Sequence, residues 1–555
     1  MWSGLVVCLW LCLGVLGEGR EGRLVNTHQG PVKGYKEPGD SVFVFHGIPY
    51  ATAPTGDYKF QAPLPPPRWF DVLEAVNSSI ICPQGILGDI TFEGLVQQEN
   101  CLVASVYVPD TDQKRLPVLV YVHGGGYQIG YANLFSPINL ARSKKVVVVT
   151  FNYRLGIHGF LCLGTDRAPG NAGMKDQVAA LEWVKRYISS YGGNPDDVTI
   201  AGYSAGSSAV DLLMISPATK GLFHKVIPES GSNMASWSVQ VDPLEQAKSF
   251  AKLKGVENVD DVYALEEFYT SASYDVLISY PFWDKTEFSF GFSPCVERKT
   301  EDAFLTESPY TILKNGKYKK VPMLYGFADM EGLIRIDKFE AWKDKMNANF
   351  SAFIPLDLQF ENDNERDAVI QKVKEFYFDN KPVSEETVLG YVDIMSDLLF
   401  VYSTLRAVNL HVNAGHDKIF LYEYNYVDNS TPIIPQSKEV RGADHCAQTV
   451  AVLDGASMYS DDESNISEEF KDVKKVMREI WINFITTGSP VPEGSSLPAW
   501  PPVGAGGAPH MSLGRTLQLR GALAEKQVRF WDSIYAKHYR EPQPPPAPPA
   551  RHSEL

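Results

Sequence analysis

The sequence has no excess of positive charge and, after its first residues, no long apolar run. Its 51 Lys and Arg residues are outnumbered by 67 Asp and Glu residues, which gives a net charge of −16. Nucleic acid is therefore not an expected partner, because phosphate binding needs a basic surface. Beyond residue 17 no stretch reaches the roughly eighteen apolar residues of a membrane span, so none is expected. No His, Cys, Asp and Glu cluster has metal-ligand spacing, and we expect neither a metal nor another cofactor.

Both ends of the chain resemble targeting segments. Residues 1–17, MWSGLVVCLWLCLGVLG, are apolar and end in small residues, which predicts a cleaved signal peptide although the run contains no Lys or Arg. The last four residues, HSEL, are similar to KDEL-type retention signals. The Pro-rich segment 541–549 predicts an extended stalk, so residues 541–555 form a tail that presents HSEL to a retention receptor. We expect the lumen of the endoplasmic reticulum or secretion; the alternative is an incidental tail.

The cysteines and glycosylation sequons fit a secretory route. Of seven cysteines, cleavage removes Cys8 and Cys12 and leaves five, which are Cys82, Cys101, Cys162, Cys295 and Cys446. In an oxidising compartment Cys82 and Cys101 can close a short loop, and the odd number leaves at least one free thiol. N-x-S/T sequons begin at Asn77, Asn349, Asn429 and Asn465. These triplets add mild support for glycosylation in the secretory pathway.

Alternating strand-like and helix-like segments predict an α/β fold. Residues 117–122 and 145–151 are continuous apolar runs, as in strands buried on two faces. Residues 174–191 repeat apolar side chains at helical spacing. Further strand candidates are 197–201, 223–227, 321–325 and 418–424. We expect one domain over residues 18–540, with a large, mostly parallel sheet flanked by helices and with helical excursions at 240–310 and 335–415.

The segment TIAGYSAGSS, residues 199–208, places Ser204 between a strand-like and a helix-like run. This context predicts a nucleophile elbow, in which a tight turn exposes the serine hydroxyl beside the N-terminus of a helix. A Cβ atom at Gly202 or Gly206 would crowd the neighbouring backbone of such a turn. Ser204 is therefore the candidate nucleophile, and the alternative is a serine in an ordinary Gly-rich turn.

A serine hydroxyl needs a base, and the base in this fold is a histidine that follows the acid in the chain. His445 follows the strand-like run 418–424 and is the candidate base, with His510 as the fallback. The acid should follow an earlier strand. Asp329 and Glu331 both follow the run 321–325, and the pattern alone does not choose between them.

An oxyanion hole needs backbone N–H groups that no side chain covers. The segment HGGGY, residues 123–127, follows a strand directly, where such a loop belongs. The candidate donors are the N–H groups of Gly125, Gly126 and Ala205, and each is worth roughly 3 kcal/mol to the transition state. The alternative is a simple Gly-rich turn.

Several motifs in order resemble the type-B carboxylesterases, the carboxylesterase and cholinesterase branch of the α/β-hydrolases, and most of all insect carboxylesterases. The matching segments are FHGIPYA (45–51), ENCL (99–102), HGGGY (123–127), NYRLG (152–156), GGNP (192–195), GYSAG (202–206), ESGS (229–232) and WINF (481–484). The resemblance implies the α/β-hydrolase fold, with helical excursions over an active-site gorge, and a Ser-His-Glu triad.

The resemblance also assigns residues that the pattern left open. It implies Glu331 as the acid, Ser230 as a hydrogen-bond donor to that carboxylate, Trp237 as an aromatic of the acyl pocket, and Cys82–Cys101 as the first disulfide. A second family disulfide has no evident pair among Cys162, Cys295 and Cys446. Cys446 directly follows His445, where the family usually has a small residue, and we interpret it as a quiet free thiol.

These features predict a carboxylic-ester hydrolase that forms an acyl-enzyme on small to medium, largely apolar esters. Choline esters are disfavoured, because the loop 83–100 has no Trp to bind a quaternary ammonium group. One alternative is a non-catalytic, neuroligin-like binding protein of the same fold. Another is a lipase, which would need an apolar lid.

Overall fold

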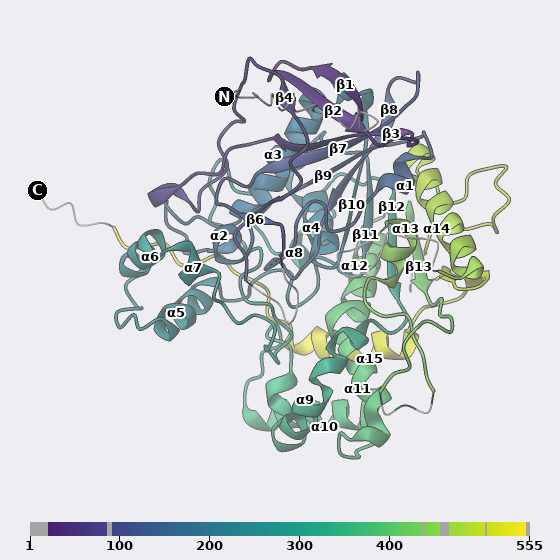
Figure 1. The fold of residues 1–555 in the computed structure, drawn as a ribbon. Helices are drawn as coiled ribbons and strands as arrows, with labels where there is room; N and C mark the ends of the chain where they lie inside the picture. Colours follow the sequence, from purple (N-terminus) through teal and green to yellow (C-terminus); the bar gives the residue numbers. More distant parts are fainter. Residues whose placement is uncertain are drawn as a thin grey trace, which may run out of the picture.

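The computed structural model describes residues 20–550 except 86–91, 436, 438, 455–465 and 505–507. The predicted signal peptide, the HSEL terminus and the sequon at Asn465 therefore lie outside the described residues. Among the described residues, thirteen strands form one large sheet, and β5 (Ile80–Ile81) and β6 (Val96–Gln97) form a separate pair (Figure 1).

The centre of this sheet is parallel. Its strands lie in the order β9 (Val147–Phe151), β8 (Leu116–Val122), β10 (Gly193–Tyr203), β11 (Lys225–Glu229), β12 (Met323–Ala328), β13 (Ile419–Tyr424) and β14 (His510–Leu513). Every neighbouring pair in this series is parallel. Because parallel strands end at the same edge, the segments that follow β10, β12 and β13 come together there.

The edges of the sheet are antiparallel. One edge is formed by β1 (Glu21–Asn26), β2 (Pro31–Lys36), β3 (Val42–Pro49) and β7 (Val103–Pro109), and the other by β15 (Leu517–Arg520). The short strand β4 (Leu73–Glu74) pairs with β2 in parallel. This mostly parallel sheet confirms the α/β fold that the alternating pattern predicted.

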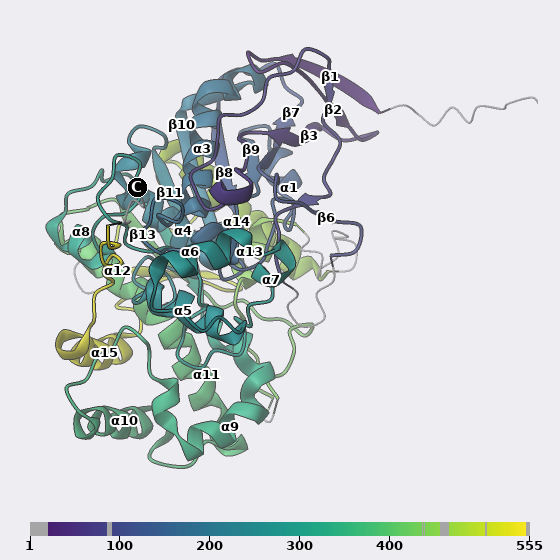
Figure 2. The same ribbon diagram turned by 90° about the vertical axis from the view of Figure 1, so that its left-hand side faces the viewer.

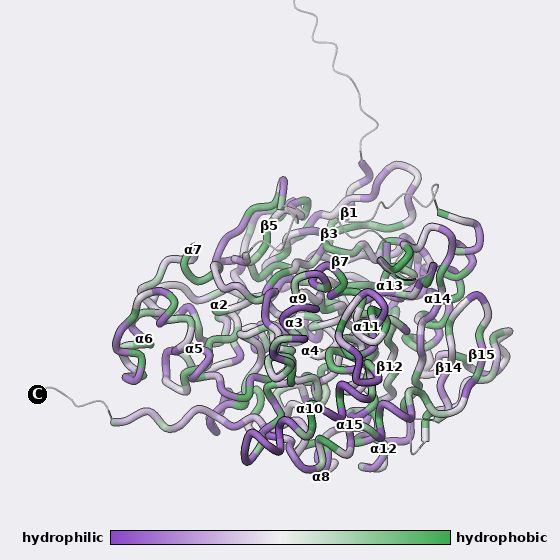
Figure 3. Tube along the Cα trace, turned by 90° about the horizontal axis from the view of Figure 1, so that it is seen from below, coloured by the Kyte–Doolittle hydropathy of each residue, from purple (hydrophilic) through white to green (hydrophobic). Residues whose placement is uncertain are grey.

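Helices cover both faces of the sheet. Along β8, Val118 and Val120 belong to one apolar core, whereas Leu119 and Tyr121 belong to a second core on the opposite face. The first core includes residues of α3 (Ala172–Tyr187) and α4 (Ala205–Ile215), and the second includes residues of α1 (Ile138–Ala141), α13 (Ala447–Val452) and α14 (Glu468–Thr487). Figure 3 shows hydrophobic segments running along β3 and β7. The continuous apolar runs of the sequence reflect this burial on two faces.

Both regions predicted as helical excursions contain helices, but the first has none among its described residues 278–308. The first contains α5 (Pro243–Leu253), α6 (Val262–Ser271), α7 (Tyr274–Leu277) and, just beyond it, α8 (Pro309–Asn315). The second contains α9 (Phe339–Ala348), α10 (Asp363–Phe378), α11 (Val388–Ser396), a π-helical turn at Asp397–Val401 and α12 (Tyr402–Asn413). Helices α9, α10 and α11 lie together at one end of the molecule in both Figure 1 and Figure 2, near α15 (Glu525–His538).

One helical stretch in the described residues, Glu385–Asn413, is long and apolar enough in composition to cross a membrane. The protein buries 83% of its apolar window. Burial of this kind is typical of a core helix, and it accounts for the apolar composition without a bilayer.

The structure contains two disulfides. Cys82–Cys101 confirms the pairing that the family resemblance implied. Cys162–Cys295 is the second, so the statement that no pair was evident among Cys162, Cys295 and Cys446 is wrong. The two partners are separated by 133 residues, and contacts formed in the fold hold their segments together, among them those of the Asn171 side chain with the backbone of Cys295 and of Arg298 with the backbone oxygen of Gly164. Cys446 is a free thiol.

Replacement of both Cys162 and Cys295 by serine is expected to lower the free energy of unfolding by about 2–5 kcal/mol, because the bond restricts a long loop in the unfolded chain. Chemical denaturation followed by tryptophan fluorescence measures this loss. Cys446→Ser serves as the control, with an expected change of about 1 kcal/mol or less. Equal losses in the two variants would contradict the assignment of a stabilising cross-link.

The Pro-rich tail does not form the free stalk that its composition predicted. The Glu541 carboxylate accepts hydrogen bonds from Ser308 and Thr311, at the start of α8. Pro542 and Pro545 are buried, and the backbone oxygen of Pro549 accepts a hydrogen bond from Tyr263. Proline favours an extended backbone, but its ring also packs well against other apolar surface. The tail is therefore held on the protein as far as residue 549.

Candidate active site

Ser204 lies at a strained turn between β10 and α4. Its φ of 54° and ψ of −124° are rare for a residue with a side chain. The turn is held by a hydrogen bond of 2.8 Å from the Ser204 N–H to the backbone oxygen of Glu229, at the end of the neighbouring strand β11. Ser204 is buried except for 7% of its surface. The backbone therefore fixes the hydroxyl at the edge of the sheet.

The glycines on either side of Ser204 are required by close backbone contacts. A Cβ atom on Gly202 would lie 2.4 Å from the backbone oxygen of Gly206. A Cβ atom on Gly206 would lie 2.2 Å from the backbone oxygen of Val122, at the end of β8. Both distances are far below van der Waals contact, so the prediction that side chains at these positions crowd the turn is confirmed.

The Gly-rich loop after β8 lies against Ser204. A Cβ atom on Gly124 would lie 3.0 Å from the Cβ atom of Ser204. Gly125 and Gly126 have φ angles of 106° and 62°, which favour glycine. In the part of the chain that the structure describes, the N–H groups of Gly125, Gly126 and Ala205 donate no hydrogen bond to the protein. Ala205 is also the first residue of α4, where the helix dipole favours negative charge.

His445 and Glu331 are in direct contact. His445 Nδ1 lies 2.5 Å from Glu331 Oε2, and the imidazole stacks on Phe400 with 4.1 Å between the ring centroids. His445 Nε2 is buried and has no hydrogen-bond partner among the described residues. With Nδ1–H bound to the carboxylate, Nε2 carries the lone pair that can accept a proton.

The Glu331 carboxylate is fixed by further donors. Ser230 donates a hydrogen bond to Oε1, and the N–H of Ala328 donates to the same oxygen at 2.8 Å. Gln448 in turn donates to the Ser230 hydroxyl. The contact between Ser230 and Glu331 is the one that the family resemblance implied.

The structure distinguishes between the two candidate acids and between the two candidate bases that the sequence left open. The Asp329 side chain accepts a hydrogen bond from the N–H of Ala443 at 2.9 Å, and burial raises its pKa to about 7. His510 Nδ1 contacts the backbone oxygen of Gly521 at 2.7 Å, in the hairpin of β14 and β15. The geometry therefore favours Glu331 and His445 over these alternatives.

Aromatic side chains surround this constellation. A Cβ atom on Gly231 would lie 2.5 Å from the backbone oxygen of Ser204 and 3.2 Å from the Trp237 ring, so the indole lies close to the nucleophile turn. Trp237 contacts Phe290 and Phe400, with ring centroids 5.5 and 6.0 Å apart, and its N–H donates to the backbone oxygen of Leu399. These contacts place an apolar wall beside Ser204 and His445.

Some of these residues were not predicted. Gln448 lies three residues after His445, a spacing that could have drawn attention to it. Phe290 and Phe400 come from the helical excursions, where no local signal identifies them. Cys446 follows the candidate base and is half-buried, and its partial removal from water raises the pKa of its thiol. It therefore stays protonated at neutral pH, as the interpretation of a quiet thiol requires.

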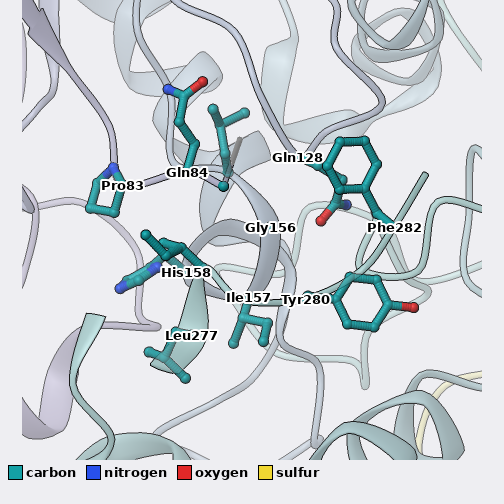
Figure 4. A pocket seen from close by; sticks show the side chains of 12 residues that line it. Pro83, Gln84, Gln128, Gly156, Ile157, His158, Leu277, Tyr280 and Phe282 are labelled. Carbon is teal, nitrogen blue, oxygen red and sulfur yellow. The ribbon is translucent and has the colours of Figure 1, made fainter. Parts of the chain in front are cut away.

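A small pocket is lined by Gln84, by His158 and by Gln128, which directly follows the segment HGGGY (Figure 4). Gln84 accepts a hydrogen bond from the N–H of Gly130 at 2.8 Å, and Gln128 donates to the backbone oxygen of Phe292. Burial lowers the pKa of His158 to about 3, so it is neutral. Gln128 also donates a hydrogen bond to the backbone oxygen of Gly126, so Gln84 and Gln128 both hold the segment that contains the three glycines. No group of metal-ligating side chains occurs within the described ranges.

Comparison with known proteins gives consistent results. The sequence model of the Carboxylesterase family matches residues 21–531. The chain is 34% identical to Esterase FE4 of Myzus persicae, over 86% of each protein, and 30% identical to juvenile hormone esterase of Tribolium castaneum, over 84% of each. It is similar to the crystal structure of juvenile hormone esterase from Manduca sexta with OTFP covalently attached, at a TM-score of 0.82 and 28% identity, over 93% of this chain and 100% of that one.

Proposed function

Because the chain belongs to the carboxylesterase family and is a carboxylic-ester hydrolase, we propose that it hydrolyses small to medium, largely apolar esters through Ser204, His445 and Glu331. The observation that carries this proposal is the contact of Glu331 with His445 Nδ1, which leaves Nε2 free at the sheet edge that also bears Ser204. The competing role of a non-catalytic, neuroligin-like protein does not require this arrangement.

In the first half of the reaction, His445 Nε2 takes the Ser204 proton while Ser204 Oγ attacks the ester carbonyl carbon. The negative oxygen of the tetrahedral intermediate accepts hydrogen bonds from the N–H groups of Gly125, Gly126 and Ala205. Glu331 stabilises the imidazolium that forms. The intermediate then collapses, the C–O bond to the alcohol breaks, and His445 returns its proton to the leaving alcohol.

In the second half, water attacks the carbonyl carbon of the acyl-enzyme, and His445 removes a proton from that water. The same three N–H groups hold the second oxyanion. Collapse releases the carboxylic acid and returns the proton to Ser204. This cycle needs only the side chains and N–H groups of the chain itself, together with water.

The aromatic wall formed by Trp237, Phe290 and Phe400 supports an apolar acyl group of limited size. We propose a xenobiotic, pheromone or similar ester as the substrate class. A lipase is the alternative.

A series of p-nitrophenyl esters from acetate to palmitate distinguishes these two functions. We expect kcat/KM to be highest for short and medium acyl chains and to fall by about tenfold or more at palmitate. The rings of Trp237, Phe290 and Phe400 limit the space that an acyl chain can occupy beside Ser204. The rate with each micelle-forming ester is measured at ester concentrations below and above its critical micelle concentration. A preference for palmitate together with a rise in rate at the micelle surface would identify a lipase instead.

We also propose that the protein enters the secretory pathway, with HSEL retaining it in the endoplasmic reticulum or the chain being secreted. Two disulfides support an oxidising compartment. The sequon residues Asn77, Asn349 and Asn429 are exposed, which a glycosylation acceptor requires. Glycosidase digestion of the expressed protein, followed by mass spectrometry, tests these sites.

A further inference from the structure

Glu229, the last residue of β11, contacts the nucleophile turn through its backbone. Its backbone oxygen accepts the Ser204 N–H at 2.8 Å, which is the hydrogen bond that holds the strained turn against the sheet. The next residue, Ser230, donates to Glu331. The chain at this point therefore joins the candidate nucleophile to the candidate acid.

The Glu229 side chain extends this connection to the base. It is fully buried, and one of its oxygens accepts a hydrogen bond from the hydroxyl of Tyr422, in β13. The other oxygen accepts a hydrogen bond of 3.0 Å from Thr449, in α13. Helix α13 begins two residues after His445. The carboxyl group thus ties the helix that follows the base to the strand that carries the nucleophile contact.

Glu229 has no cationic partner among the described residues, which is unusual for a buried carboxyl group. Burial, with a smaller contribution from the Glu331 charge, raises its pKa to about 7, although the Tyr422 and Thr449 hydroxyls favour the charged form. The other titratable groups that interact with it are Tyr121 and Cys446, and removal from water keeps both of these protonated. Glu229 is therefore the group of this set whose charge changes near neutral pH.

We propose that Glu229 is a positioning residue of the esterase reaction, which locks the Ser204 turn to the helix after His445 and adds a second negative charge behind Glu331. This inference rests on the proposed triad. It assigns to Glu229 no contact with the substrate. Glu229 acts on Ser204 by fixing the backbone of its turn. It acts on Glu331 and His445 through its negative charge.

The direction of the charge effect follows from electrostatics. An ionised Glu229 favours the imidazolium form of His445, because both negative charges attract the proton on that ring. It therefore keeps the base protonated up to a higher pH. Glu229→Gln keeps the size of the side chain but carries no charge at any pH. The acid limb of the kcat/KM profile, which reports the pKa of the free base, should move to lower pH by about half a unit or less, because Glu229 is only partly ionised in that range.

The experiment measures kcat/KM for p-nitrophenyl acetate from pH 5 to 9 in wild type and Glu229→Gln. Glu423→Gln is the matched control, since it neutralises a partly buried carboxyl on the same strand as Tyr422 without a contact to the proposed triad. We expect a shifted acid limb in Glu229→Gln and an unshifted limb in Glu423→Gln. A lower rate with an unshifted limb in Glu229→Gln would overturn the proposal, because loss of packing alone gives that result.

A second variant covers the case in which Glu229→Gln does not fold. Thr449→Val removes a donor to the charged form of Glu229, so Glu229 is ionised to a smaller extent and the acid limb should move in the same direction by a smaller amount. A folded Thr449→Val protein with an unmoved limb would also overturn the proposal. Absence of esterase activity in the wild-type protein is a different outcome, and it would refute the proposed function rather than the role of Glu229.

Discussion

Replacement of Ser204 by alanine is expected to lower kcat for a p-nitrophenyl ester by at least about 10⁴-fold, with little change in KM. In the proposed mechanism the Ser204 hydroxyl supplies the oxygen that forms the acyl-enzyme, and neither neighbour at the turn, Tyr203 or Ala205, carries an aliphatic hydroxyl that could replace it. In the proposed site the acyl group binds against the aromatic wall of Trp237, Phe290 and Phe400, which the substitution leaves in place. Steady-state kinetics of the purified protein measures both constants, with circular dichroism as the check that the variant folds.

Covalent labelling tests the same residue independently. An organophosphate should modify Ser204 alone, and peptide mass spectrometry locates the modified residue. Ser216→Ala is the matched control, because Ser216 lies at the other end of α4 and hydrogen-bonds the backbone of Phe304. This control should retain nearly full activity and full labelling. A label on another serine, or full activity in Ser204→Ala, would refute the assignment of the nucleophile.

The central strands could be predicted from sequence because burial on two faces leaves a continuous apolar run, as in β9. The prediction for β11 was less accurate. The pattern indicated a strand at 223–227, whereas the structure has Lys225–Glu229. Pro228 and Glu229 are poor strand residues by composition, but Tyr422 and Thr449 satisfy the buried carboxyl group. The strand therefore continues because of partners that are distant in the chain.

The second disulfide and the tail show the same limit. The pairing of Cys162 with Cys295 depends on two segments that only the folded chain brings together. The composition of residues 541–549 correctly predicted a segment without helix or strand. It carried no information on the surface that Pro545 packs against, near Gly164. Local sequence sets local conformation, whereas docking depends on a surface built from other parts of the chain.

For the site, chain order and strand ends identified Ser204 and His445 as candidates but left Asp329 and Glu331 equivalent, since both follow β12. The difference arises in three dimensions. The chain turns back after Ala328, so that its N–H reaches Glu331 Oε1 and directs the carboxylate towards His445. Asp329 instead points to the N–H of Ala443. A choice between two carboxylates two residues apart requires this turn, which the sequence pattern does not contain.

Replacement of Glu331 by glutamine is expected to lower kcat/KM by about 10³- to 10⁴-fold, and the reason lies in its hydrogen bonds. Ser230 and the N–H of Ala328 both donate to Oε1, so the amide oxygen of a glutamine must take that place. The NH₂ group then faces His445 Nδ1 and requires a lone pair there. The imidazole proton moves to Nε2, which can no longer accept the Ser204 proton.

Asp329→Asn provides the matched comparison for Glu331→Gln. The amide oxygen of asparagine can still accept the N–H of Ala443, so the loop that carries His445 keeps its support and the loss in kcat/KM should stay below about tenfold. Kinetics at pH 8 for both variants, with thermal unfolding to show that each is folded, measures the difference. If Asp329→Asn lost as much activity as Glu331→Gln, Glu331 would not be the residue that orients the base.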